Sequence, residues 1–386
     1  MAFLANKTVN RLYVNYGLLA LAASGGGVFF AVFLIKAGVS IPIVLCAYAL
    51  INAGRFVLRP LVLVAAKRVG LKPVVIAGAL VLAAQYPILA QVDGLGPALA
   101  ALVLTVTVGE TFYWTAYHAY FGQLGDAEHR GHQTSAREAI AAVVGIGGPV
   151  AGGWALANLG PQAAFGAVAI VQALAVVPLL GAPNVAVPAV AAGGFAQARQ
   201  GFLLYLADGW IGAGTAVMWQ MALFLSLSGS FTAFGGAMAL AAFVGAATGL
   251  LLGRHIDAGK GVRVVWLCCV ILTATIVLRA SAVSPAMAVA ANALGALITC
   301  IYFPTHMTAA YNLAKRSPCA FRFQLWAEAG WDLGRGGACL AAAALVALGA
   351  PLQGAILLSL GGVATVTMLL LRYYGAEAPV AVQSES

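Results

Sequence analysis

Twelve long apolar runs follow one another along the chain, and they constrain its fold more than any other feature. A helix needs about 20 mostly apolar residues to cross the hydrocarbon core of a bilayer. The composition agrees, because 62% of the 386 residues are hydrophobic and only 8% are charged, too little polar surface to cover a water-soluble protein of this size. We therefore predict an all-α membrane protein with transmembrane helices at 12–36, 40–66, 73–92, 96–122, 135–158, 162–182, 201–228, 231–253, 262–281, 284–313, 322–349 and 352–372.

The loops between these segments predict the orientation, because cytoplasmic loops carry an excess of Lys and Arg. The basic residues of the loops fall on one side of this topology, and the other side keeps only Lys36 and Arg279. We predict a multi-pass protein of the inner (cytoplasmic) membrane with both termini in the cytoplasm. The net charge of +9 is explained by the same loops, so we expect no nucleic-acid partner.

The second half of the sequence echoes the first, which predicts an internal repeat. A stretch rich in Pro and Gly at 181–200 divides the twelve segments into six and six. "FYWTAYHAYFGQL" (112–124) is echoed by "IYFPTHMTAAYNL" (301–313), and Glu138 and Glu328 stand in register to within one residue. We predict two pseudo-symmetric six-helix bundles, with the N-terminal bundle at 1–182, a cytoplasmic linker at 183–200 and the C-terminal bundle at 201–386.

Three local motifs resemble those of the major facilitator superfamily. "GRHIDAGKG" (253–261) matches its loop pattern G-x-x-x-D, and "GPVAGG" (148–153) matches the G-P-x-x-G-G motif associated there with proton-coupled exporters. The equivalent loop of the first half, "AAKRVGLK" (65–72), keeps the basic-x-Gly part but has Lys67 where the family usually has aspartate. The resemblance implies the 6+6 helix plan and transport by alternating access.

The glycine motif also has a physical interpretation without the family. Gly148, Gly152 and Gly153 remove side chains, so a neighbouring helix can approach closely. Pro149 leaves a carbonyl unpaired and bends the helix. We predict a hinge at this point, and the alternative is a packing surface with no bearing on transport direction.

Charged residues inside apolar segments are costly and therefore mark function. Arg55 and Arg59 lie one turn apart on one face of the second segment, while Glu328, Asp332 and Arg335 share a face of the eleventh. The two sets have similar depths, and in the family's fold these segments face each other. We predict that the arginines pair with the acids in a cytoplasmic gate when that side is closed, and that alternating access makes and breaks this gate. The alternatives are a proton or anion site, or an Asp332–Arg335 pair within one helix. A second contact of the same sort is expected from Arg137 and Glu138 with Arg254, across the interface of segments 5 and 8, and Asp257 is counted with the gate.

Glu110 is the leading candidate for proton coupling, because a carboxylate in a low-dielectric site can exchange a proton near neutral pH. On a helix it lies within about 100° of Tyr113, Trp114 and Tyr117, with His118 on the flank. These aromatics either line a substrate cavity or pack between helices. The further proton-coupling candidates are Asp208, Glu138 and His118. The further cavity candidates are Asn15, Arg55, Trp219 and His306.

These features predict a secondary transporter rather than an enzyme. We expect proton-coupled export of a small organic, amphiphilic or anionic compound by a monomer. The sequence has no P-loop and no Cys-x-x-Cys spacing, so we expect no cofactor and no resident metal. The alternatives are a proton-coupled importer of an organic anion, a copper-type metal transporter built on "MWQM" (218–221) and His306–Met307, and a ligand-binding sensor on a transporter scaffold.

Overall fold

The computed structural model describes residues 6–124, 130–187, 195–252 and 261–376, and every regular element within them is a helix. Residues 6–187 are called the first half below, and residues 195–376 the second half. The first half contains α1 (Lys7–Gly25), η2 (Gly27–Phe29), α2 (Phe30–Lys36), α3 (Ile41–Val69), α4 (Leu71–Leu89), α5 (Pro97–Leu124), α6 (Arg130–Asn158), α7 (Gly160–Leu174) and α8 (Val177–Leu180). The second half contains α9 (Phe195–Gly212), η3 (Ala213–Met218), α10 (Trp219–Ser226), α11 (Phe231–Leu252), α12 (Gly261–Ala280), α13 (Pro285–Arg316), α14 (Ala320–Ala347), α15 (Leu352–Ile356) and α16 (Ser359–Ala376).

Within the described residues, 11 helical stretches are long and apolar enough to cross a membrane. The remaining predicted segment, the eleventh (322–349), corresponds to α14, which is 28 residues long and carries four charged side chains: Arg322, Glu328, Asp332 and Arg335. Aliphatic side chains cover the outside of the bundle, where Val57, Leu104 and Ile170 are each more than 60% exposed. Such a surface suits lipid tails and would be unfavourable in water. The predicted all-α, multi-pass membrane fold is therefore confirmed.

Several predicted segments contain a local break. The first one is interrupted by η2, a short 3₁₀ turn that begins at the last of three consecutive glycines. The seventh segment passes through η3, a π-helical turn that joins α9 to α10. Glycine loses more conformational freedom in a helix than other residues do, so a run of glycines destabilises the helix. The first break therefore follows from the sequence.

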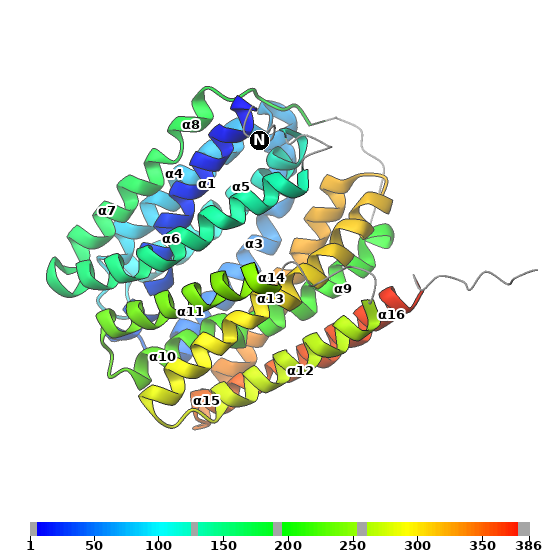
Figure 1. Cartoon of the computed structure of the whole chain (residues 1–386). Coiled ribbons are helices and arrows are strands. Elements are labelled where there is room, and N and C mark those ends of the chain that lie inside the picture. Colours follow the sequence, from blue (N-terminus) through cyan, green and yellow to red (C-terminus); the bar gives the residue numbers. More distant parts are fainter. Residues whose placement is uncertain (1–5, 125–129, 188–194, 253–260, 377–386) are drawn as a thin grey trace, which may run out of the picture.

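Two pairs of helices join the halves. α3 lies along α14, and α6 lies along α11, so each pair has one member from each half (Figure 1). Within the halves, α1 packs on α6 and α9 packs on α14. The predicted domain boundaries stay a prediction, although α9 begins at Phe195, inside the predicted linker.

The glycine motif of α6 lies at one of these contacts. A side chain at Gly152 would meet the carbonyl oxygen of Gly25 in α1, and one at Gly153 would meet the carbonyl oxygen of Phe231 in α11. A side chain at Gly235 of α11 would meet the carbonyl of Pro149 in turn. The motif thus packs α6 closely against a helix of each half, and its role as a hinge remains a prediction.

We expect Gly152→Ala to destabilise the protein by about 1–3 kcal/mol, because a new methyl group would push against backbone that cannot move aside. The measurement is the thermal unfolding of purified protein in detergent. Gly147→Ala, in the same helix, is the matched control because no atom lies within 4 Å of its added carbon. Equal melting temperatures for the two variants would contradict the close packing.

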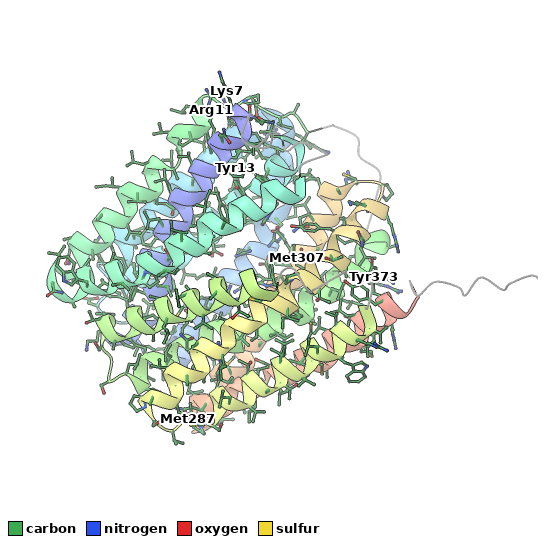
Figure 2. The ribbon with its side chains drawn as sticks, viewed as in Figure 1. Lys7, Arg11, Tyr13, Met287, Met307 and Tyr373 are labelled. Atoms are coloured by element: carbon green, nitrogen blue, oxygen red, sulfur yellow. The ribbon has the colours of Figure 1, made fainter. Side chains whose placement is uncertain are left out.

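The two ends of the molecule differ in how the halves meet. Figure 2 shows Lys7 and Arg11 at one end, called the Lys7 end, and Met287 at the other, called the Met287 end. At the Met287 end, Phe29 of the first half contacts Phe231 and Phe234 of the second at ring distances of 6.1 and 5.6 Å. The largest apolar cluster includes both halves here, whereas first-half residues nearer the Lys7 end form a cluster of their own. The apolar cores are therefore joined at the Met287 end and separate at the Lys7 end.

Candidate functional site

Three helices carry charged side chains to the middle of the bundle. Arg55 lies at the midpoint of α3, and Glu110 and Asp332 lie close to the midpoints of α5 and α14. α3 packs against both of the other helices, so its arginines can reach acids on either side. Unpaired charges at this depth would be costly, and ion pairing between these helices reduces that cost.

Five of these side chains form a continuous charge network: Arg55, Arg59, Glu110, Glu328 and Asp332. Arg59 donates from Nε to Asp332 Oδ2 at 2.7 Å and also forms an ion pair with Glu328. Arg55 Nε lies 3.0 Å from Asp332 Oδ1, at an angle outside that of a hydrogen bond, and Arg55 forms a second ion pair with Glu110. The pairs expected between α3 and α14 are thus present, and Glu110 joins them, which the sequence pattern did not indicate.

Burial separates Glu110 from the rest of the charge network. The side chains of Arg55, Arg59, Glu328 and Asp332 are at most 9% exposed, whereas that of Glu110 is 30% exposed. The network has three carboxylates for two guanidinium groups, so the acids exceed the arginines by one. The accessible charge of the network is therefore negative.

Neutral polar groups extend the charge network. Arg59 Nη1 donates to Thr115 Oγ1 at 3.0 Å, and Gln324 Nε2 donates to Glu328 Oε1 at 3.2 Å. His118 is exposed on α5 and lies within electrostatic reach of Glu328 in the other half. Thr115 and Gln324 were absent from the sequence prediction. The spacing of Gln324 four residues before Glu328 is the signal that could have found it.

Arg335 does not follow the prediction that it belongs to the ion-pair gate. No carboxylate lies within ion-pair distance of it in the part of the chain that the structure describes. Its guanidinium lies instead over two rings, 4.7 Å from the centre of Trp331 and 5.4 Å from that of Tyr48 in the first half. Asp332 is already paired with Arg55 and Arg59, so it does not pair with Arg335. The cation–π contacts stabilise the Arg335 charge instead.

Three first-half candidates for a substrate cavity are enclosed in the core of that half. Tyr113, Tyr117 and Asn15 are all 0% exposed. Asn15 Nδ2 donates to the carbonyl of Ala175 at 2.6 Å, which ties α1 to the end of α7. Gly78 lets α4 approach α5 so closely that it covers Tyr113. None of these three side chains lines an accessible cavity in this structure, and Trp114 is half-buried. Their role in a substrate cavity stays a prediction.

The second-half candidates are also enclosed, apart from Asp208. His306 is 1% exposed and lies between the rings of Tyr205 and Tyr302, and Trp219 is 2% exposed and donates to Asn292 at 2.9 Å. Neither lines an accessible site, because both pack inside their own half. Asp208 is half-buried and accepts a hydrogen bond from Tyr302 at 2.8 Å. It lies apart from the charge network.

Some predicted residues cannot be placed. Arg254 and Asp257 lie outside the described residues, and the side chain of Glu138 is not among those described. No group of three His, Cys, Asp or Glu side chains suited to a metal ion occurs in the described part of the chain.

No family model and no curated protein matches this sequence. Solved structures are nevertheless similar over nearly the whole chain. The POT family transporter PepTSo aligns with a TM-score of 0.70 at 11% identity, over 96% of this chain and 98% of its own. The Major Facilitator Superfamily (MFS) transporter FucP, in the outward conformation, aligns at 0.66 and 16% identity, over 95% of this chain and 98% of its own.

A third similar structure, a bacterial homologue of the iron transporter ferroportin in an inward-facing state, has a TM-score of 0.62 at 14% identity. The alignment covers 95% of this chain and 98% of that one. Likeness at such low identity establishes the fold. The chain therefore has the major facilitator fold of membrane transporters, as the resemblance in its sequence predicted.

Proposed function

We propose that the protein is a proton-coupled secondary transporter that exports a small organic compound across the inner membrane by alternating access. One observation carries this proposal: Arg55 is shared between Glu110 in its own half and Asp332 in the other half. The "GPVAGG" motif at the contact between the halves supports the export direction.

The sharing of Arg55 offers a physical route for coupling. When Glu110 is ionised, it competes with Asp332 for the Arg55 guanidinium, which weakens the attraction between α3 and α14. When Glu110 takes up a proton, the competition ends and Arg55 is held by Asp332 alone. The charge state of the accessible acid therefore sets how strongly the two halves are held together at the middle of the bundle.

The other candidate functions receive less support from the geometry. An imported anion would have to displace Asp332 or Glu328 from arginines that they already satisfy. A copper-type site is disfavoured because His306 is enclosed and the Met307 sulfur accepts a hydrogen bond from Tyr205 at 3.8 Å. A sensor would bind ligand but move none in proteoliposomes.

We expect Glu110→Gln to abolish proton-coupled transport while leaving the protein folded. Proteoliposomes with a pH dye inside would be given an imposed pH gradient and a panel of small organic cations and anions. A transported compound should dissipate the gradient with wild-type protein and leave it intact with Glu110→Gln. Asp93→Asn removes the same charge from an exposed loop position and should behave as wild type. Undiminished coupling in Glu110→Gln would refute the assignment.

A further inference from the structure

We infer that the substrate is an organic cation, whose positive group binds Glu110 in competition with Arg55 and whose apolar part lies against Trp114. This inference rests on the proposed transport function and names its substrate class. Three independent features of the site carry it: a cation that the site already holds, the accessibility of its charges, and the aromatic surface beside them.

The site already binds an organic cation, which is the side chain of Arg55. Its guanidinium forms the ion pair with Glu110 and lies 5.3 Å from the centre of the Trp331 ring. A carboxylate together with an indole face is the combination that recognises ammonium and guanidinium groups. A substrate cation would therefore find at Glu110 the carboxylate that Arg55 now uses.

Accessibility selects a positive ligand over a negative one. Glu110 is the accessible charge of the network, while Arg55 and Arg59 have side chains that are 7% and 4% exposed. An anion would meet the Glu110 carboxylate first and would then have to compete with the buried Asp332 for both arginines. A cation needs to displace only one partner, because Arg55 is the one cation within ion-pair distance of Glu110 in the described part of the chain.

Aromatic side chains continue from Glu110 towards the Lys7 end. Trp114 and His118 follow it on α5 at intervals of four residues, so all three share one face. Trp114 is half-buried and His118 is exposed, and their rings stack with centres 5.7 Å apart at 26°. This surface suits the apolar or aromatic part of an amphiphilic cation.

Cation binding would act on the contact between the halves. A substrate that takes Glu110 releases one arm of Arg55, whose guanidinium then pairs with Asp332 of the other half alone. Substrate and proton would thus have the same effect on Arg55 and could not occupy the same oxygen together. Because substrate and proton bind the same Glu110 carboxylate, the protein would exchange a substrate cation for a proton.

The test compares probes of matched shape and opposite charge on full-length protein in detergent at pH 7. The pairs are tetraphenylphosphonium with tetraphenylborate, and 2-phenylethylammonium with phenylacetate, measured by isothermal titration calorimetry. We expect at least one cation to bind wild-type protein at least tenfold more tightly than its anion. Glu110→Gln should weaken that cation about tenfold to a hundredfold, and Asp93→Asn should leave it unchanged.

Arg55→Gln gives the sharpest contrast. It removes the internal competitor, so we expect cation affinity to rise severalfold, whereas a site for anions would lose its binding group. Trp114→Ala should weaken the cation and Trp114→Phe should retain part of the affinity, which provides a test if a charge variant fails to fold. Preferential binding of the anions, loss of cation binding in Arg55→Gln, or no cation binding at all would overturn the inference.

The outcomes separate this inference from the proposed function. If the protein transports an anion coupled to protons, the proposed function stands and the inference of a cationic substrate is rejected. If cations bind in a Glu110-dependent way but no compound is transported with protons in proteoliposomes, the cation site stands and the proposed transport function is rejected.

Discussion

Asp332→Asn is expected to destabilise the protein by about 3–5 kcal/mol, the cost of breaking a buried ion pair by removing one partner. Asp332 is 0% exposed and is shared by both arginines, so its neutralisation leaves two buried guanidinium groups short of a counter-charge. Thermal unfolding of the purified protein in detergent measures the loss. We also expect Asp332→Asn to abolish transport in proteoliposomes, because the α3–α14 contact loses its central acid.

Asp208→Asn is the control for this change. Asp208 is also an acid of the second half, but its described partner is the neutral hydroxyl of Tyr302. An asparagine carbonyl can still accept that hydrogen bond, so we expect a loss of less than about 1 kcal/mol. Similar losses for the two variants would show that Asp332 is not specifically required by the arginines.

Charge reversal at the Arg59–Glu328 pair should have the second large effect. Arg59→Glu alone places a fourth acid among the three present, and Glu328→Arg alone adds a third buried arginine, so each should inactivate transport. The double variant restores one opposite-charge pair between the halves and should recover part of the activity. Recovery stays partial because Asp332 then faces Glu at position 59.

The control for the double variant restores net charge without restoring the pair. Arg59→Glu combined with Asp93→Arg has the same charge total as the wild type, but residue 93 lies in an exposed loop. Recovery of proteoliposome transport in this control would mean that total charge matters and the pair does not. No recovery in the matched Arg59→Glu, Glu328→Arg variant would argue against an interaction between these residues during transport.

The α3–α14 ion pairs could be expected from the sequence because they depend on two local properties. Helical spacing placed Arg55 and Arg59 on one face, and rise per residue placed them at the depth of Glu328 and Asp332. The structure contains Arg59 with both acids and Arg55 with Asp332. Their action as a gate remains a prediction.

The contacts of Glu110 and of its aromatic neighbours could not be predicted from helical spacing and rise. A helical wheel groups Glu110 with Tyr113, Trp114 and Tyr117, but it does not say which neighbour covers each part of that face. The approach of α4 at Gly78 encloses Tyr113, whereas Glu110 turns towards Arg55. An arc of about 100° is wide enough to contact two different helices.

The sequence by itself determined most of the helical spans and the similar depths of the α3 and α14 charges, because hydropathy and helical rise are local properties of the chain. Tertiary structure decided which charge meets which. That choice depends on the rotation and separation of whole helices, which close glycine contacts such as those at Gly152 and Gly78 set between segments far apart in the sequence. Arg55 between Glu110 and Asp332 exists only where α3, α5 and α14 come together.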